Sequence, residues 1–554
     1  MKLLNLLLRH QRLPFAAIIL LSLGSAILSV ALIAFVNWRM IAVTTPQFGD
    51  LLQFFGLLLL LLLCAGAGQV SLHRLGHRFV YGLRLSLARR VLLTDIEQLE
   101  RLGLPRLLTA LSTDLRNLTI AFVYLPELIY GLILSLAAFA YLLWLSPPLF
   151  GVTLLWLGMT LLLGGFFVAR VNRHIRQLRE AEDRLYRDYQ ALIDGRKELA
   201  LNRRRGQCLL DEELMVNAEA YRHHVTLADT FNGLAGNWAN VMVLGSIGVV
   251  FFCASGLGWA EPAIAATFAL CVLFLRAPLV ASVAALPHLL TARVSLDKID
   301  SLELATEGGE QLPSLAQRHW QRLELRGIEY AYPAAGDEQG FDVGPLDFEL
   351  RRGELVFVVG GNGSGKSTFA RLLTGLQRPG RGQVLLDGKA LSEAERPAYR
   401  QLFASVFTDF HLFARLLGPE GDAQPESASF WLERLRLQHK VRIEGGRLSD
   451  TRFSQGQRKR LALLLALLEE RDVLLLDEWA ADQDPQFRQL FYRELLPQLK
   501  TMGKTVVAIT HDDHYFDQAD RLLKMDGGRL IELTGAERRR ASEDALREIG
   551  TVVG

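Results

Sequence analysis

Six long apolar segments in the first 290 residues constrain the fold of this 554-residue chain more than any other feature. Each is close to the roughly 20 residues that an α-helix needs to cross a bilayer. The six segments are residues 13–36, 51–72, 120–145, 149–168, 234–255 and 262–286. The first is too long for the apolar core of a signal peptide, so we expect it to remain as a membrane helix. We therefore predict a six-helix α-helical transmembrane domain over residues 1–302.

The segments between these spans differ sharply in positive charge. Residues 73–116 contain eight arginines, and residues 170–231 contain eleven arginines and one lysine, whereas the turns at 146–148 and 256–261 contain none. Because Lys and Arg favour the cytoplasmic side of a membrane, this asymmetry places both termini and both long segments in the cytoplasm. Apolar residues recur at helical spacing through residues 80–91, which predicts that the membrane helices continue beyond the bilayer.

The remainder of the chain has the pattern of a soluble domain. Residues 303–320 are polar and contain Gly and Pro, which indicates a linker. After it, short apolar runs such as Leu355–Val359, Val473–Leu476 and Val506–Ile509 alternate with helical stretches. This alternation is typical of an α/β domain with a largely parallel sheet. We assign it residues 321–554.

Charge and cysteine content exclude several classes of protein. The 61 Lys and Arg nearly balance the 59 Asp and Glu, and a formal net charge of +2 argues against a protein that coats nucleic acid. None of the four cysteines forms a CxxC pair, so they read as small core residues and not as a disulfide framework or a zinc site.

A phosphate-binding loop follows the predicted strand Leu355–Val359. Residues 360–367 read GGNGSGKS, fit GxxxxGK[ST], and precede a helical run. Glycines let backbone N–H groups surround phosphate oxygens, Lys366 reaches the β- and γ-phosphates, and the Ser367 hydroxyl ligates Mg²⁺. The predicted ATP-binding residues here are Gly360, Asn362, Gly363, Ser364, Gly365, Lys366, Ser367 and Thr368.

Two acids end the apolar run Val473–Leu476. Asp477 suits the Mg²⁺ side of a nucleotide site, and Glu478 suits polarising the attacking water. The alternative is a strand end with two solvated acids, but the phosphate-binding loop about 110 residues upstream favours the functional interpretation.

Residues 453–457, FSQGQ, resemble the LSGGQ signature of ABC transporters. Ser454, Gly456 and Gln457 match, whereas Phe453 and Gln455 depart from the pattern. The alternative is an ordinary Ser-capped helix. In the family this motif, whose start offers N–H groups to a phosphate, acts on the nucleotide of the other subunit. The resemblance therefore implies a homodimer, because two chains in head-to-tail register complete two sites.

Further family positions follow from the same resemblance. Tyr332 resembles the aromatic residue that stacks on adenine, Asp484 the D-loop aspartate, and His511 the switch histidine that contacts the γ-phosphate. A core aromatic and a structural histidine are the respective alternatives for Tyr332 and His511. Thr408 stands where the family has a Q-loop glutamine. We hypothesise that Thr408 or Asp409 takes over its contact with Mg²⁺ or the Mg²⁺-bound water.

The whole chain resembles the type I, six-helix half-transporters among the ABC exporters. Residues 407–409, 417–421 and 477–485 look like the bacterial subfamily that exports cyclic peptides, including microcin-type lasso peptides and pyoverdine-type siderophore precursors. The resemblance implies ATP-driven export of a peptide or siderophore-like compound across the bacterial inner membrane, by alternating access in a lipid-embedded homodimer. Residues 196–202 are a candidate coupling segment, with a solvated helix as the alternative.

Two alternatives to this function stay open. One is a broad-specificity lipid or drug exporter. The other is a non-transporting ABC regulator, which the presence of Lys366, Asp477, Glu478 and His511 disfavours because such proteins often lose the catalytic carboxylate.

Arg276 lies near the middle of the sixth predicted span. A charge there costs about 2.5–3.5 kcal/mol on insertion scales, so its side chain needs a partner or a wet cavity. One hypothesis is that it binds an anionic group on the cargo; the other is that it pairs with Glu127 of the third span. Asn232, Asn237 and Asn240 are further candidates for hydrogen bonds in the bundle or for cavity lining.

Overall fold

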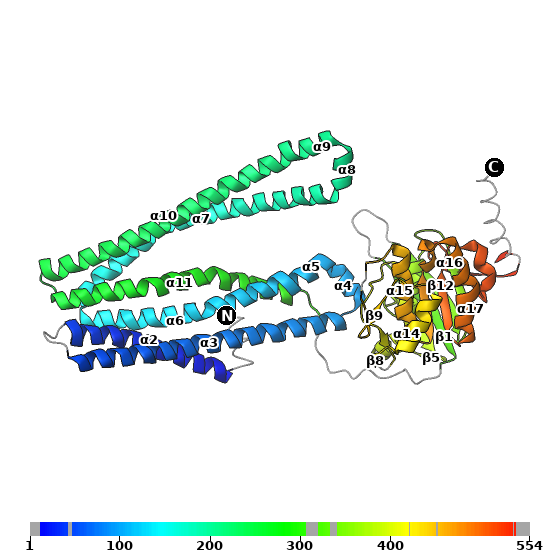
Figure 1. The fold of residues 1–554 in the computed structure, drawn as a ribbon, viewed down its shortest axis with the longest axis horizontal. Helices are drawn as coiled ribbons and strands as arrows, with labels where there is room; N and C mark the ends of the chain where they lie inside the picture. The colour runs from blue at the N-terminus through cyan, green and yellow to red at the C-terminus, as the bar shows by residue number, and fades with distance from the viewer. Residues whose placement is uncertain are drawn as a thin grey trace. The chain divides into compact units, whose positions relative to one another are not determined.

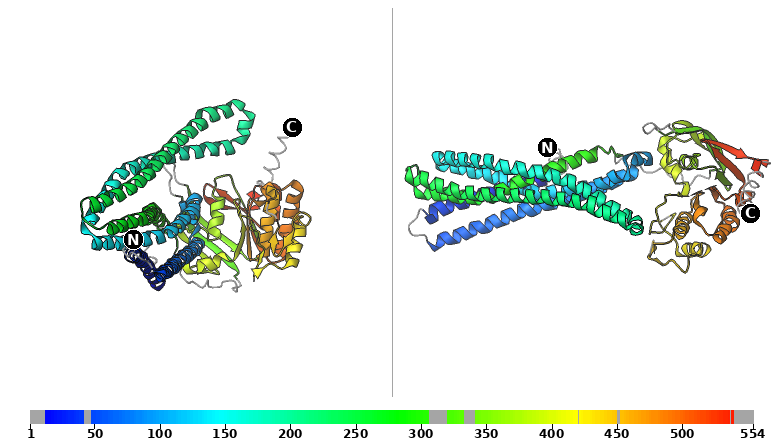
Figure 2. Two further views of the ribbon diagram at one scale, coloured as in Figure 1. Left: turned by 60° about the vertical axis from the view of Figure 1, so that its left-hand side comes forward. Right: turned by 90° about the horizontal axis from the view of Figure 1, so that it is seen from above.

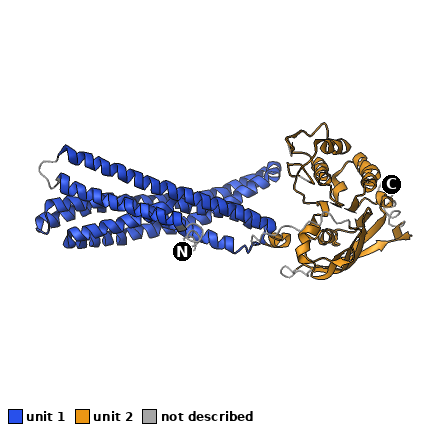
Figure 3. Ribbon diagram, turned by 90° about the horizontal axis from the view of Figure 1, so that it is seen from below, with its two compact units in different colours: residues 1–93, 102–306 blue, residues 94–101, 307–554 orange. Residues whose placement is uncertain are grey.

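The computed structural model describes residues 12–41, 47–305, 320–332, 341–419, 421–449, 452–535 and 537–538. The chain divides into two compact units (Figure 3). Unit 1 comprises residues 1–93 and 102–306, and unit 2 comprises residues 94–101 and 307–554. Most of the predicted linker, 303–320, lies outside the described residues. The short stretch 94–101 belongs to unit 2, although the sequence places it in the membrane domain.

Within the described residues, unit 1 contains six helices that are long and apolar enough to cross a membrane. They are α2 (Arg12–Phe35), α3 (Phe48–Leu93), α6 (Leu115–Leu145), α7 (Pro147–Asp194), α10 (Met215–Phe251) and α11 (Pro262–Asp300). Shorter helices join them: η1 (Val36–Ile41), α4 (Ile96–Leu102), α5 (Leu104–Thr109), η2 (Ala110–Asp114), α8 (Arg196–Leu201), α9 (Arg203–Cys208), η3 (Leu209–Leu214) and η4 (Phe252–Gly256). The predicted spans lie within the long helices, except that the first ends at the start of η1 and the fifth ends in η4.

Helices α3 and α7 extend far beyond the length of a membrane span. They contain 46 and 48 residues. At about 1.5 Å per residue, each is roughly 70 Å long, more than twice the hydrocarbon thickness of a bilayer. This confirms the prediction that the spans continue as helices. In Figure 1, α7 and α10 form a long hairpin whose far end carries α8 and α9.

Helices α2, α3, α6 and α11 lie side by side, whereas the α7–α10 hairpin diverges from them (Figure 2). Close packing of α6 on α11 depends on Gly131, because a Cβ there would lie 2.7 Å from the carbonyl oxygen of Pro278. Ala26, Leu134 and Leu275 bring α2, α6 and α11 together in one buried cluster. Small residues let helix backbones approach closely where lipid supplies no hydrophobic driving force.

Unit 2 is built on a six-stranded sheet in the order β14-β13-β3-β12-β11-β6. Its strands are β3 (Leu355–Val359), β6 (Phe403–Val406), β11 (Val473–Asp477), β12 (Thr505–Ile509), β13 (Arg521–Asp526) and β14 (Arg529–Leu533). Every pairing is parallel except β13 with β14. The largely parallel α/β architecture is thus as predicted. An antiparallel sheet in the order β2-β1-β4-β5 accompanies it.

The remaining elements of unit 2 surround these sheets. The antiparallel strands are β1 (Arg322–Ala331), β2 (Asp342–Arg351), β4 (Arg381–Leu386) and β5 (Lys389–Ala390), and two short pairs are β7 (Leu417–Gly418) with β8 (Gly421–Asp422) and β9 (Ile443–Glu444) with β10 (Arg447–Leu448). The helices are α12 (Lys366–Leu373), η5 (Glu393–Glu395), α13 (Arg396–Arg400), α14 (Pro425–Arg434), α15 (Gln455–Leu468), η6 (Trp479–Asp482), α16 (Pro485–Leu490), η7 (Phe491–Leu495), α17 (Leu496–Thr501) and η8 (Asp513–Gln518).

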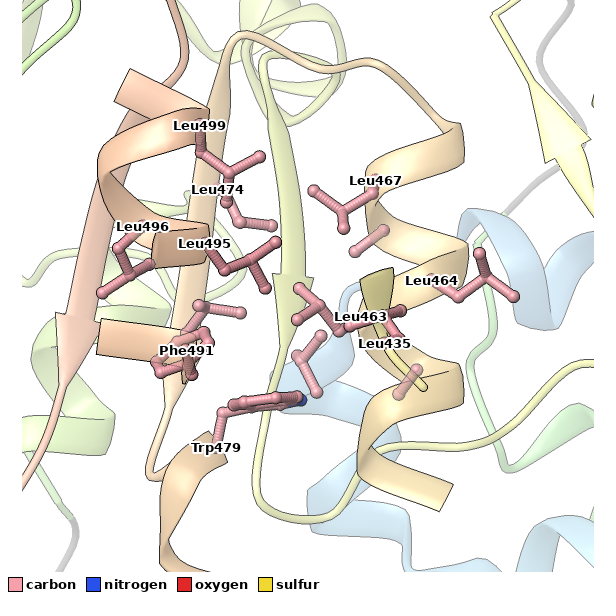
Figure 4. Packing of buried hydrophobic residues seen from close by; sticks show 14 of the residues in the cluster. Leu435, Leu463, Leu464, Leu467, Leu474, Trp479, Phe491, Leu495, Leu496 and Leu499 are labelled. Carbon is pink, nitrogen blue, oxygen red and sulfur yellow. The ribbon is translucent and has the colours of Figure 1, made fainter. Parts of the chain in front are cut away.

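A leucine-rich core holds the helices against the parallel sheet (Figure 4). Leu463 and Leu467 of α15 point toward the strands, on the side where Leu474 of β11 lies, and Trp479 lies just past the end of β11. The Trp479 ring stacks near Phe491 with centroids 4.4 Å apart. Burying such side chains contributes about 1.5–3 kcal/mol each, so the end of β11 is firmly anchored.

Candidate functional site

The phosphate-binding loop joins β3 to α12. Gly360, Gly363 and Gly365 have φ values of 153°, 74° and 105°, which glycine adopts without strain. A Cβ at Gly360 would also collide with the carbonyl of Met525. The buried Lys366 ammonium donates to the carbonyl oxygens of Gly360 and Gly361, both at 2.9 Å. The Lys366 side chain therefore folds back onto the loop that carries it.

Glu478 and His511 meet at adjacent strand ends. Strands β11 and β12 pair in parallel up to Asp477 and Ile509, so the residues that follow them lie together. The Glu478 Oε1 atom lies 3.1 Å from His511 Nε2 and 3.8 Å from Lys366 Nζ. The three residues predicted to be catalytic thus form one cluster. A carboxylate flanked by an imidazole and an ammonium is a suitable base for a water attacking a phosphate.

Asp477 lies beside this cluster and is only 1% exposed. Burial raises the pKa of its carboxyl group, and a hydrogen bond with Ser367 partly opposes that effect. Its Oδ1 atom is buried without a hydrogen-bond partner in the described part of the chain, as is Ser364 Oγ in the loop. Buried polar atoms of this kind are satisfied by water, an ion or a ligand in most proteins. Ser367 and Asp477 fit a Mg²⁺ ion, which would neutralise phosphate charge when bound.

Replacing Asp477 with Asn should stabilise the metal-free protein near neutral pH while reducing ATP hydrolysis at least about 100-fold. Because burial raises the folded-state pKa of Asp477, its contribution to stability is present at low pH and lost as pH rises through that pKa. The neutral amide avoids this loss. Thermal unfolding of both proteins in EDTA, from pH 3 to 8, should show the melting temperature of the Asp477→Asn variant rising relative to that of wild type as pH increases from about 4, the unfolded-state pKa, and levelling off above the raised folded-state pKa. A pH-independent difference would contradict this explanation.

The backbone of Glu478 adopts the left-handed conformation, with φ 49° and ψ 35°. This conformation is strained for a residue with a Cβ and persists only where neighbours enforce it. Here the Lys459 ammonium donates to the Glu478 carbonyl and to Asp482 Oδ2, both at 2.7 Å, while Trp479 Nε1 donates to the Lys459 carbonyl. Lys459 is 4% exposed. It positions the carboxylate, a role that the sequence did not reveal.

Ser454 begins helix α15 and caps it. Its hydroxyl accepts from the Gln457 N–H at 3.4 Å, and Gln457 Oε1 accepts from the Ser454 N–H at 3.3 Å. The helix is therefore Ser-capped as the alternative interpretation proposed, which leaves the action of residues 454–457 on a second subunit's nucleotide as a prediction. The substituted Gln455 is the first residue of the helix.

The signature helix is tied to the D-loop by polar contacts. Gln483 Nε2 donates to the Gly456 carbonyl at 3.1 Å, and Arg460 donates to Gln483 Oε1 at 2.7 Å and to Asp484 Oδ2 at 2.6 Å. Asp484 Oδ1 also accepts from the Phe487 N–H at 2.9 Å and caps α16. That backbone bond is the largest effect and lowers the pKa of Asp484; burial opposes it, and Arg460 adds to the lowering. Asp484 therefore has a defined role inside its own subunit.

Tyr332 and Thr408, the other residues predicted to contact the nucleotide, have fewer contacts that define their role. The Tyr332 hydroxyl lies 3.1 Å from Thr368 Oγ1, and its ring meets Tyr330 edge-on, so Tyr332 lies beside the first turn of α12. Thr408 and Asp409 are exposed and follow β6, which pairs with β11 through Val406 and Leu476. Adenine stacking by Tyr332 and the Q-loop role of Thr408 stay predictions.

The side-chain partner of Arg276 is not Glu127, which was one of the two hypotheses from the sequence. Its guanidinium donates to Asn240 Oδ1 on α10. Arg276 lines a small cavity with Trp156 and Thr160, whereas Glu127 lines another. Asn240 is thus a bundle hydrogen-bond partner, as one prediction had it. Binding of an anionic cargo group by Arg276 stays a prediction.

One functional contact was missed at residues 94–101, which belong to unit 2. Asp95 lies 2.6 Å from Arg378 and 3.4 Å from Arg400, and Glu100 lies 3.0 Å from Arg371. Arg371 is on α12, the helix that begins at Lys366. The only sequence signals were the interruption of the helix after Leu93 and the Gly103 turn. The predicted coupling segment, 196–202, comprises α8 and Asn202 at the far end of the α7–α10 hairpin.

A nucleotide-hydrolysing domain that follows six helices of membrane-spanning length defines an ATP-driven membrane transporter. Residues 343–481 match the family described as ABC transporter. The chain is 35% identical over 541 residues to the ATP-binding protein SyrD of Pseudomonas syringae pv. syringae, covering 94% of both proteins. The chain belongs to the ABC transporter family, and its ATPase activity is coupled to transport.

Other relatives match shorter parts of the chain. The lipoprotein-releasing system ATP-binding protein LolD of Pseudomonas syringae pv. tomato is 33% identical over 38% of this chain and 97% of its own length. The methionine import ATP-binding protein MetN 2 of Rhodococcus jostii is 32% identical over 34% of this chain and 59% of its own length. The 94% coverage by SyrD extends the similarity through both units.

Proposed function

We propose that this protein exports a peptide or siderophore-like compound across the bacterial inner membrane. Its ATPase domain and both termini face the cytoplasm, as the distribution of Arg and Lys predicts. Membership of the ABC transporter family supports the coupling of ATP hydrolysis to transport. The segments 407–409, 417–421 and 477–485, which resemble cyclic-peptide exporters, support the choice of cargo, and the similarity to SyrD over 94% of both chains supports the ABC architecture.

The contact between residues 94–101 and the ATPase core carries this proposal. This stretch is covalently continuous with α3, a helix long enough to cross the membrane and extend well beyond it. Its ion pairs reach Arg371 on α12, the helix that carries the phosphate-binding Lys366. Movement at the nucleotide site is thereby linked to a membrane helix within one chain. A regulator that hydrolyses no ATP would have no use for the complete Lys366–Glu478–His511 cluster.

The functional unit in this proposal is a homodimer working by alternating access. Each chain holds one phosphate-binding loop, 360–367, and one signature segment, 453–457. In the family the signature completes the partner's nucleotide site, and two identical chains related by a two-fold axis complete both. ATP binding would close the two ATPase domains, and hydrolysis at Glu478 would release them.

ATP-dependent uptake of a labelled cyclic peptide into inside-out vesicles tests the cargo and the direction together. Wild-type vesicles should accumulate the peptide with ATP and not with a non-hydrolysable analogue, because export from the cell becomes uptake in this orientation. Vesicles with Glu478→Gln provide the matched hydrolysis-deficient control. If Glu478-dependent ATPase activity persists without peptide uptake, peptide export is wrong; uptake of many apolar compounds instead would favour the lipid or drug exporter.

A further inference from the structure

A mainly apolar cavity with a few polar groups lies within unit 1 where α2, α3 and α6 meet. It encloses about 200 Å³, and its ten lining residues include a single charged side chain, Glu127, and no Lys, Arg or His. Ser22, Gln69 and Tyr130 add polar groups, while Leu72 and Pro126 add apolar surface. The three helices run side by side in both orientations shown (Figures 1 and 2). Glu127 is exposed in the single chain, so a ligand can reach its carboxyl group.

Glu127 lies well inside the apolar segment 120–145. An ionisable group at membrane depth is costly unless it meets a partner or water, and it marks a functional site by default. Arg276, the cation that the sequence offered as its partner, bonds to Asn240 and lines a separate cavity. Within the described residues, Glu127 forms no ion pair. The Glu127 carboxylate is therefore left for something outside this chain's own basic residues.

The helix geometry aims Glu127 at this cavity. Glu127 and Tyr130 are three residues apart on α6 and share one face. The Tyr130 hydroxyl lies 3.2 Å from Ser29 Oγ on α2, which fixes that face toward α2. Gly131 packs instead against Pro278 of α11. The cavity is therefore held in place by contacts on two sides of α6.

We propose that this cavity binds a cationic group, and we assign it to a primary ammonium on an apolar stem of the cargo peptide. The Glu127 carboxylate accepts one of the three ammonium hydrogens, and the Gln69 amide oxygen and the Tyr130 hydroxyl oxygen accept the other two. A volume of about 200 Å³ exceeds the roughly 30 Å³ share of one water and admits the stem as well. This assignment rests on the proposed function, because it names a feature of the exported molecule.

Equilibrium binding to the full-length protein in nanodiscs, without ATP, tests the site. The probes are a fluorescent cyclic lipopeptide with one free primary amine and its N-acetylated twin. Wild type should bind the amine at least about tenfold more tightly than the twin, a preference of about 1.4 kcal/mol. Glu127→Gln should bind both equally, whereas Glu127→Asp should keep part of the preference. Glu261→Gln, which removes an exposed carboxylate just before α11, is the matched control and should keep all of it.

Each result decides the assignment. An undiminished preference in Glu127→Gln, or none in wild type, would overturn it. Replacing NaCl with choline chloride separates the sources of a cation: if Na⁺ affects wild type but not Glu127→Gln and the amine gives no advantage, the site takes an inorganic cation and the ammonium assignment fails. Basal ATPase activity verifies that each variant is folded. Because binding is measured without ATP, an intact amine preference with no vesicle uptake would refute export while leaving the site in place.

Discussion

Replacing Glu478 with Gln should lower steady-state ATPase activity by about 10²- to 10⁴-fold, the range for removing a general base. The amide keeps the shape of the side chain and a hydrogen bond to His511, so only the capacity to accept a proton is lost. Lys366 and the glycines of the loop are untouched. ATP binding, measured with a fluorescent ATP analogue, should change less than about twofold, while phosphate release falls to the detection limit.

A matched control for this substitution lies on the same domain. Glu494 is exposed on η7, and Glu494→Gln removes one carboxylate without touching the cluster around Lys366. Its ATPase rate should equal that of wild type. A Glu478→Gln protein that kept more than a tenth of the wild-type rate would show that another group activates water, and His511 would become the first candidate.

Reversing the charge of Asp95 should uncouple ATP hydrolysis from transport. Asp95→Arg would face Arg378 and Arg400 with a third positive charge in place of two ion pairs. We expect vesicle uptake to fall at least about tenfold while basal ATPase activity changes less than about twofold. Asp95 is half-buried, and ion pairs that stay open to solvent contribute only about 0.2–1 kcal/mol to folding, so the fold should survive. Uptake and ATPase activity measured on the same vesicles check this result.

A charge swap makes the Asp95 experiment specific. Adding Arg378→Asp to Asp95→Arg restores an opposite-charge pair and should recover part of the uptake. Glu97→Gln serves as the control from the same segment, since Glu97 pairs with Arg101 on its own helix and not with the ATPase core. Equal losses of uptake in Glu97→Gln and Asp95→Arg would mean that the segment acts through its helix stability alone.

The features predicted best from sequence are those fixed by local chemistry. Glycines at positive φ, Lys366 and the flanking strand define the phosphate-binding loop without reference to the rest of the fold. Parallel strands ending in Asp477 and Ile509 bring Glu478 and His511 together, because strand ends of one sheet share an edge. Long apolar runs predicted the membrane helices, because the thickness of the bilayer sets the length of a spanning helix.

The features that sequence did not reveal depend on partners far apart in the chain. Asp95 forms ion pairs with Arg378 and Arg400, which lie about 300 residues later in the chain, and no local sequence pattern indicates that pairing. The left-handed backbone of Glu478 is equally hidden, because it depends on the buried ammonium of Lys459. Arg276 forms a hydrogen bond with Asn240 and not an ion pair with Glu127, because the rotation of each helix about its axis decides which polar side chains meet in a bundle.

The unbroken length of α3 has a mechanical consequence. Its 46 residues form one rod of about 70 Å that ends at Leu93, one residue before the stretch that contacts the ATPase core. For a rigid rod pivoting at one end, a tilt of about 4° displaces the other end by about 5 Å, close to one helical turn. In the proposed mechanism α3 would act as a lever, and two glycines substituted at its exposed middle would let the helix bend instead of transmitting the displacement.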